Sequence, residues 1–397
     1  MKHFKLLSAS LAVAFTLLTA CQKDPDSAIA PLNAKNDTSL ATQQATQLTP
    51  VTQAQIAQLI AALPKGTLEK LQQKSALLVK LNPEYRTIVG RAIQPTPCNS
   101  ATPLNLWLDQ QLQDWNTQVI TNALDLGMLD LPTYDALVFE NSSANQYFGI
   151  NGDYTQRLTK AFKDLQRFWN IDSKGIVLAA MHGNMLLNHE RVARTYVAVF
   201  GVDPATASQL ADIVVLLADQ VPQYRDGNHP IFTFNAFAQS GFNFPPYGVI
   251  PNKIIMGDGI LEAYNAIGYS DVAPQAILAH EFGHHIQFQL NLFTDETSPE
   301  ATRRTELMAD AYSAYYLSHA RGASMQWKRV KQFLQVFVNI GDCSFTSDNH
   351  HGTPTQRMAA AEWGYSVANN AQKQGQILSA QEFTRLFEAQ LPVFVRL

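Results

Sequence analysis

The chain has little charge, few cysteines and no basic run. Charged residues make up 16% of its 397 residues, and the formal net charge is −4. Nucleic-acid-binding surfaces need clustered Lys and Arg, so we do not expect a nucleic-acid partner. After the first 20 residues, no apolar run approaches the roughly 18 residues that a membrane-spanning helix needs. Hydrophobic residues make up 46% of the chain, which is enough for a globular core of several layers.

The N-terminus has the pattern of a secretory signal peptide. Lys2 and Lys5 accompany the apolar run Leu6–Leu18, and small residues follow it. Cys21 comes directly after Leu-Thr-Ala, which resembles the lipobox of bacterial lipoproteins. The resemblance implies that Cys21 carries lipid and holds an exported protein on the membrane of the cell envelope. Gln22 is compatible with an outer membrane, where the protein would face the periplasm or the cell surface. Ordinary cleavage just before an unmodified Cys21 is the alternative.

Only two further cysteines are present, Cys98 and Cys343. In an oxidising compartment they could form a disulfide that ties the N-terminal region to the loop before the last motif. Two buried free thiols are the alternative, because spacing does not decide the pairing.

The composition divides the chain into four parts. Residues 1–20 are the signal peptide, and residues 21–50, which are rich in Gln, Thr, Ala, Asp and Ser, are typical of a disordered tether. Residues 51–99 predict a small helical region with a break at Pro64-Lys65-Gly66. Residues 100–397 predict one larger α+β domain, predominantly helical. Its periodicity predicts helices over Tyr154–Trp169, Val177–Asn188 and Ala205–Gln220, then strands over Ile231–Ala238 and Val249–Met256.

The most informative segment is His280-Glu281-Phe282-Gly283-His284. Residues four apart lie on one face of a helix, so His280 and His284 can bind the same metal ion. Glu281 is then placed to accept a proton from a water that the metal activates. The helix is expected from about Pro274 to Leu290. Gly283 indicates a close approach, either of a substrate or of a packed neighbour.

A second helix supplies the third ligand that a catalytic zinc needs. Ser298 suits its N-cap and Pro299 its first position, and a short polar loop precedes it. The two helices can therefore lie side by side, which makes Glu306 the predicted third metal ligand. Asp310, one turn later, is predicted to accept a hydrogen bond from a ligand histidine. A solvated Glu306, and an Asp310 paired with a nearby arginine, are the alternatives.

Three motifs occur in the order seen in a known family: Ala279–Gln287 (AHEFGHHIQ), Glu306–Ala311 (ELMADA) and His351–Tyr365 (HGTPTQRMAAAEWGY). Together they resemble the bacterial neutral zinc metallopeptidase family, over roughly residues 250–368. The resemblance implies a zincin-like fold with a small sheet before the metal-binding helix, one Zn²⁺ ion, and hydrolysis of peptide bonds in a peptide or protein substrate. It implies His280 and His284 as zinc ligands and Glu281 as the general base, and it matches Glu306 to the third ligand.

Three further assignments each have an alternative. A peptidase must stabilise a developing oxyanion, and His351 is our candidate, with a structural role in the loop as the alternative. Ile254–Met256 is expected as an edge strand that could pair with substrate, or else as an internal strand. His182 and His189 lie seven apart on one predicted helical face and could hold a second metal, but core or surface roles are the simpler interpretation. The rival oxyanion-stabilising groups are Tyr312, Tyr315 and Tyr316, at positions that are usually core.

The sequence thus predicts a lipid-anchored zinc peptidase with Glu281 as general base. Two alternatives remain at this stage. A zinc amide hydrolase acting on cell-wall peptides would use the same ligands. A non-catalytic, membrane-anchored scaffold would carry a vestigial metal site. The substrate and the oligomeric state are not indicated by the sequence.

Overall fold

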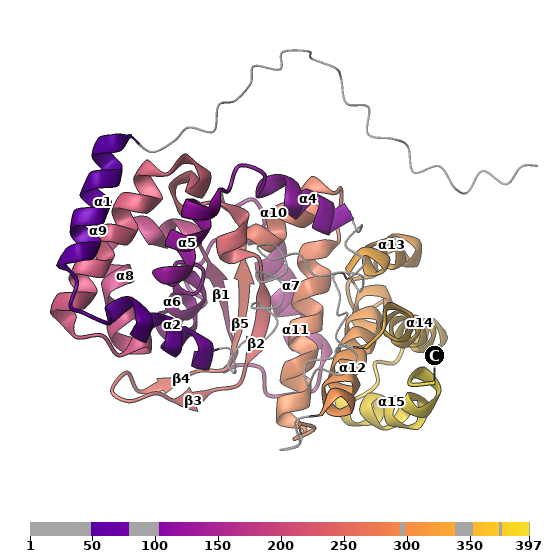
Figure 1. Ribbon diagram of the computed structural model, residues 1–397. Helices are drawn as coiled ribbons and strands as arrows, with labels where there is room; N and C mark the ends of the chain where they lie inside the picture. Colours follow the sequence, from indigo (N-terminus) through magenta and orange to yellow (C-terminus); the bar gives the residue numbers. More distant parts are fainter. Residues whose placement is uncertain (1–48, 79–102, 294–297, 338–351, 373–374, 397) are drawn as a thin grey trace, which may run out of the picture. The chain divides into compact units, whose positions relative to one another are not determined.

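The computed structural model describes residues 49–78, 103–293, 298–337, 352–372 and 375–396 (Figure 1). Contacts divide the chain into residues 1–44 and 45–397, and every described residue belongs to the second unit. This unit is an α+β fold that is predominantly helical, as the sequence predicted. Cys21, Cys98, Cys343 and His351 lie outside the described residues, so their roles stay predictions. No helix of the described residues has the length and hydropathy needed to span a membrane.

The described residues form fourteen α-helices besides the sheet. Those before the sheet's last strand are α1 (Pro50–Ala62), α2 (Thr67–Leu78), α4 (Pro103–Gln111), α5 (Thr117–Asp125), α6 (Leu131–Phe139), α7 (Thr155–Phe168), α8 (His189–Thr195) and α9 (Pro204–Gln220). Those after it are α10 (Asp258–Ala266), α11 (Ala273–Gln289), α12 (Pro299–Ser318), α13 (Trp327–Phe337), α14 (Pro354–Gln372) and α15 (Ala380–Phe394). The expected break between α1 and α2 is present, and the two helices pack against α9 and α5, within the same compact unit.

A three-stranded sheet has the order β1-β5-β2. Strand β1 (Val177–Met181) runs parallel to the central strand β5 (Lys253–Gly257), and β2 (Ala236–Gln239) runs antiparallel to it. The prediction of a helix over Val177–Asn188 is therefore wrong: a buried parallel strand is apolar throughout, which periodicity cannot distinguish from a buried helix.

Of the two possibilities for Ile254–Met256, the structure shows the internal strand, because β5 has a partner on both sides. The strand predicted over Ile231–Ala238 begins only at Ala236, since Pro230 starts a short 3₁₀ helix that ends at Thr233. A separate hairpin pairs β3 (Phe242–Asn243) with β4 (Val249–Ile250). The strand predicted over Val249–Met256 is divided between two strands, β4 and β5.

The helix boundaries follow from local capping. The Asp203 side chain accepts from the Thr206 amide at the start of α9, and Ser298 accepts from the Ala301 amide at the start of α12. At the start of α14, the Thr353 hydroxyl and the Gln356 side chain bond each other's backbone amides, both at 3.1 Å. These caps fix where α12 and α14 begin, and therefore which side chains α12 presents to α11 and which α14 presents to α12.

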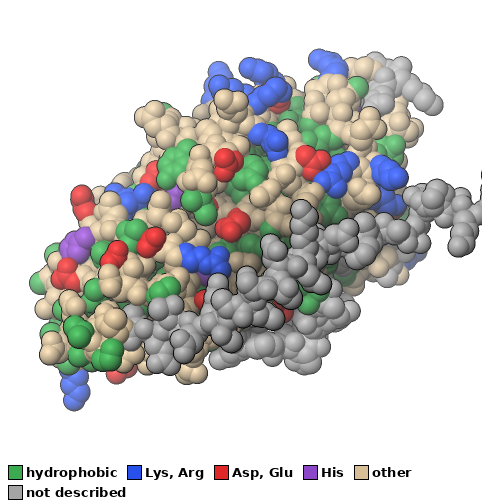
Figure 2. Space-filling model, turned by 90° about the horizontal axis from the view of Figure 1, so that it is seen from above, with side chains coloured by type: hydrophobic (Ala, Val, Ile, Leu, Met, Phe, Trp, Pro, Cys, Tyr) green, Lys and Arg blue, Asp and Glu red, His purple; other side chains and the backbone are tan. Residues whose placement is uncertain are grey.

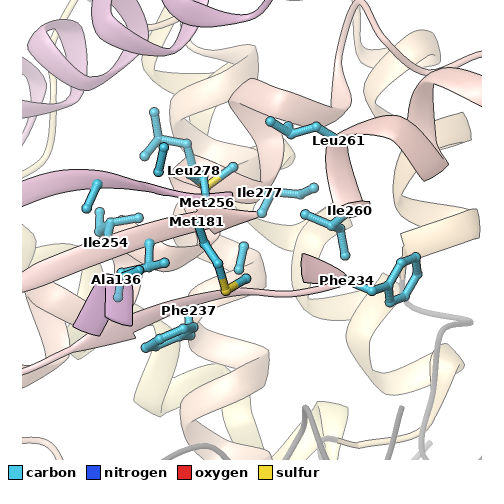
Figure 3. Close-up of a cluster of buried hydrophobic side chains, with 14 of the residues drawn as sticks. Ala136, Met181, Phe234, Phe237, Ile254, Met256, Ile260, Leu261, Ile277 and Leu278 are labelled. Carbon is cyan, nitrogen blue, oxygen red and sulfur yellow. The ribbon is translucent and has the colours of Figure 1, made fainter. Parts of the chain in front are cut away.

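The sheet and α11 share the central core. Figure 3 shows Ile277 and Leu278 of α11 among Met181, Met256 and other apolar side chains of the strands and α10. All four side chains are at most 2% exposed. Because this face of α11 packs on the sheet, its remaining face is available to α12, which lies beside it (Figure 1).

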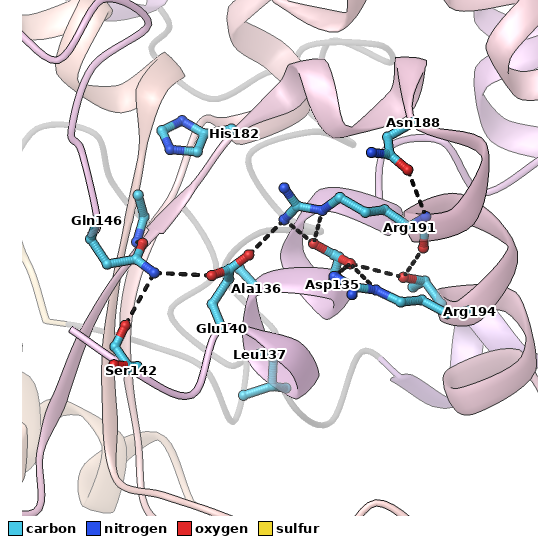
Figure 4. A network of polar contacts seen from close by, with 12 residues as sticks. Asp135, Ala136, Leu137, Glu140, Ser142, Gln146, His182, Asn188, Arg191 and Arg194 are labelled. Carbon is cyan, nitrogen blue, oxygen red and sulfur yellow. Dashed lines mark hydrogen bonds and ion pairs between the residues drawn. The ribbon is translucent and has the colours of Figure 1, made fainter. Parts of the chain in front are cut away.

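A buried polar network connects β5 to α6. Lys253 is fully buried, and its Nζ donates to the Ala136 and Leu137 carbonyls near the end of α6, at 3.0 and 2.6 Å. Asp135 of the same helix accepts hydrogen bonds from Arg191 of α8, 2.9 Å from Nε (Figure 4). Burial lowers the pKa of Lys253 to about 8 against the raising effect of nearby carboxylates. The hydrogen bonds of Lys253 thus hold the central strand against α6.

The surface in Figure 2 carries Lys and Arg side chains in separate groups, with acidic side chains between some of them. This mixed pattern on that face agrees with the low net charge of the sequence.

Candidate metal centre

Gly283 allows α11 and α12 to pack closely against each other. A Cβ atom built there would lie 3.2 Å from the Cα of Ala309 and 3.4 Å from the Cβ of Tyr312, both on α12. Those distances are tight for a side chain, so glycine permits the two helices to approach. Of the two interpretations that the sequence left open, the structure favours packing of a neighbouring helix.

His280, His284 and Glu306 converge where these helices meet. The Nε2 atom of His280 lies 3.3 Å from one Glu306 carboxylate oxygen, and the Nε2 atom of His284 lies 3.4 Å from the other. Among the described residues, these three form the single group of metal-binding side chains whose donor atoms all lie within 4.8 Å of one another. His280 and Glu306 are 4% and 6% exposed, and His284 is somewhat more open. The sequence-predicted ligands therefore form a set that could bind a metal ion.

Asp310 orients the first histidine. The Nδ1 atom of His280 is 3.0 Å from an Asp310 carboxylate oxygen, which leaves Nε2 to face Glu306. Asp310 is fully buried, and Arg357 of α14 donates to both of its oxygens, at 2.7 and 2.9 Å. The hydrogen bond predicted for Asp310 is present, and the partner among the two histidines is His280.

Gln287 orients the second histidine in the same way. Its Oε1 lies 3.0 Å from Nδ1 of His284, and its Nε2 donates to the Thr305 carbonyl at 2.7 Å. Thr305 directly precedes Glu306, so this side chain ties the second histidine to the backbone beside the carboxylate. Both imidazoles therefore present Nε2 toward Glu306, because each Nδ1 is engaged elsewhere.

Charge balance at the cluster is reflected in its pKa values. Burial alone would lower the pKa of His280, but hydrogen bonds to Asp310 and Glu306, together with their charges, raise it from 6.5 to about 10. Burial alone would raise the pKa of Asp310, but the charge of Arg357 and the hydrogen bond from His280 hold it below 3.8. The cluster thus favours a cation between the imidazoles and the carboxylates, whether that cation is a proton or a metal.

The residues beside the ligands have distinct environments. Glu281 is 7% exposed and follows His280 directly on α11. His285 is buried and points to the sheet, where its Nε2–H donates to the Lys253 carbonyl at 2.8 Å. Burial lowers its pKa to about 4. His285 is therefore a neutral packing residue that connects the metal-binding helix to β5.

The three tyrosines that were rival candidates for stabilising the oxyanion form hydrogen bonds within the core. Tyr312 and Tyr315 direct their hydroxyls to Thr384 and to the Leu378 amide, and Tyr316 directs its own toward the Ala161 carbonyl, so the three are core residues.

His182 and His189 do not share a helical face. His182 follows β1 and bonds Asp258 at 2.7 Å, whereas His189 begins α8 and lies 3.2 Å from Asp212. The structure therefore does not bring them together as a second metal site.

Two residues that orient the cluster, Gln287 and Arg357, were not predicted from the sequence. Both were contained in the quoted motifs, Gln287 as the last residue of AHEFGHHIQ and Arg357 in HGTPTQR. The signal was present, but only the contacts across helices reveal what each side chain bonds.

Comparison with known proteins gives no further guide: no family model, curated protein or solved structure matches the chain. The site must therefore be interpreted from its own geometry.

Proposed function

We propose that the chain is a zinc-dependent peptidase with a zincin-like arrangement of sheet and metal helix. The observation that carries the proposal is the convergence of two imidazole nitrogens and one carboxylate, each oriented by a buried partner. Three protein ligands with a place for water are the pattern of catalytic zinc sites, whereas structural sites use four protein ligands.

The donor atoms are close enough to share one ion. One Glu306 oxygen lies 3.3 Å from Nε2 of His280, the other lies 3.4 Å from Nε2 of His284, and one donor atom from each residue lies within 4.8 Å of the others. The mixed set of imidazole and carboxylate donors is also one that suits zinc.

In the proposed reaction, zinc would supply Lewis acidity, which polarises the substrate carbonyl and lowers the pKa of water to about 7. Glu281 accepts the proton of the attacking water and returns it to the leaving amine. Asp310 and Gln287 hold the imidazoles in the tautomers that leave Nε2 unprotonated. His351 is proposed to stabilise the oxyanion. Cys21 is proposed to anchor the protein by lipid to the cell envelope, where it would cleave peptide or protein substrates.

The test is incubation of the purified full-length protein with a peptide library and with peptidoglycan fragments, with and without a chelator. We expect cleavage of peptides that the chelator abolishes and added zinc restores. Glu281→Gln should lower turnover by about 10²- to 10⁴-fold while zinc content stays unchanged.

Cleavage of peptidoglycan stems alone would redirect the proposal to cell-wall amide hydrolysis. A zinc-loaded protein that cleaves neither substrate would contradict the proposed activity. Loss of zinc in Glu281→Gln would contradict the assignment of Glu281 as the base.

A further inference from the structure

An aromatic pair lies beside the metal cluster. The Phe293 ring is 6.3 Å from the His284 ring and stacks on Phe288, with centroids 4.8 Å apart and planes inclined by 27°. Phe293 is 44% exposed, so the residues that the structure describes leave much of its apolar surface uncovered. His284, with 12% of its side chain exposed, is the most open of the three ligand side chains, compared with 6% for His280 and 8% for Glu306. The exposed ring therefore lies next to the most accessible part of the cluster.

The backbone that carries Phe293 is fixed. Asn291 adopts a left-handed φ of 52°, and the Leu292 amide donates to the Gln287 carbonyl at 3.0 Å. Arg304 donates to the Leu292 carbonyl at 2.8 Å and is itself paired with Glu388 of α15, 2.8 Å from Nε to Oε1. The turn after α11 is thus tied both to that helix and to α12. Single exposed apolar residues are common, but this one is held in place at the edge of a reactive site.

We propose that Phe293, stacked on Phe288, is a specificity-determining residue that binds an aromatic or large apolar side chain next to the bond being cleaved. This inference rests on the proposed peptidase function and names its substrate class. An aromatic side chain would stack on the exposed ring and remove it from water, which a small or charged side chain would not do. Among the described residues, the rings that contact the pair are those of His284, beside Phe293, and His285, beside Phe288.

The test compares two peptides that differ only in having Phe or Ala beside the cleaved bond, with that bond mapped first by mass spectrometry. For the wild-type enzyme we expect a higher kcat/KM for the Phe peptide. Phe293→Ala should reduce this preference about tenfold, and Phe293→Tyr should retain it, since aromatic stacking is kept. Tyr147→Ala is a matched control, because Tyr147 is another exposed aromatic, at 40%, that stacks on His182, a histidine outside the cluster.

A binding measurement separates recognition from catalysis. In the zinc-loaded Glu281→Gln protein, Phe293→Ala should raise the dissociation constant of the Phe peptide about tenfold and leave that of the Ala peptide unchanged. A preference for the Phe peptide that survives Phe293→Ala, or cleavage with no apolar preference, would overturn this inference and leave the peptidase function standing. Failure of the wild-type protein to cleave any peptide would overturn the peptidase function instead.

Discussion

Replacement of Asp310 by Asn tests how the cluster is held. Asp310 accepts from His280 through one oxygen, and from the Arg357 guanidinium through both. The carboxamide keeps the shape but removes the charge, and it turns an N–H group toward a donor of Arg357. Loss of such a partner of a metal-binding histidine typically costs 10- to 100-fold in metal affinity. That corresponds to about 1.4–2.8 kcal/mol.

The same substitution should weaken the fold. Arg357 is 8% exposed, and the Glu306 carboxylate lies 3.8 Å from its guanidinium. Removing one partner of a buried ion pair typically costs about 3–5 kcal/mol of unfolding free energy, because the other charge stays buried. Urea unfolding in the presence of a chelator measures this loss of unfolding free energy. Competition with a chromophoric chelator measures the zinc affinity.

Arg357→Met is the matched control for this experiment. It breaks the same ion pair but leaves the His280–Asp310 hydrogen bond, so stability should fall while zinc affinity changes much less than in Asp310→Asn. Wild-type zinc affinity in Asp310→Asn, or equal losses of affinity in both variants, would refute the reasoning.

Two further outcomes follow from the geometry of the site. Gly283→Ala places a Cβ 3.2 Å from the Cα of Ala309, so α12 must shift by a few tenths of an ångström; overpacking of this kind typically costs about 1–3 kcal/mol in urea unfolding, and unchanged stability would contradict the close approach. Because carboxylate partners outweigh burial and raise the pKa of His280 to about 10, zinc must displace a proton from it between pH 6.5 and 9. Apparent zinc affinity should therefore rise about tenfold per pH unit over that range, measured by chelator competition, whereas an affinity independent of pH would show that His280 is already neutral.

The helices that carry the site could be predicted from the sequence because their signals are local. The predicted metal helix from about Pro274 to Leu290 corresponds to α11 (Ala273–Gln289), and the Ser298 cap begins α12 as expected. A spacing of four residues places both histidines on one face, and a short loop places Glu306 opposite them. Local signals of this kind, acting together, were sufficient to predict which three side chains converge into a group that could bind a metal ion.

The sheet could not be predicted as well, because strand order depends on contacts distant in sequence. Val177–Met181 is apolar throughout and buried from Leu178 onward, so its pattern fits a strand and a helix equally. Ile254–Met256 became an internal strand because β1, more than 70 residues earlier in the chain, pairs with it. The roles of Gln287 and Arg357 likewise depend on how α11, α12 and α14 pack, which no single segment specifies.

We propose above all that His280, His284 and Glu306 together bind one zinc ion. The most direct test is zinc K-edge X-ray absorption on the full-length protein, with metal content measured for the wild type and for Glu306→Ala. We predict one zinc per wild-type chain, with two imidazole nitrogens and one carboxylate oxygen at about 2.0–2.2 Å, and a sharp loss of zinc in Glu306→Ala. Unchanged zinc content in Glu306→Ala, or a wild-type ion with no imidazole ligands, would contradict the account.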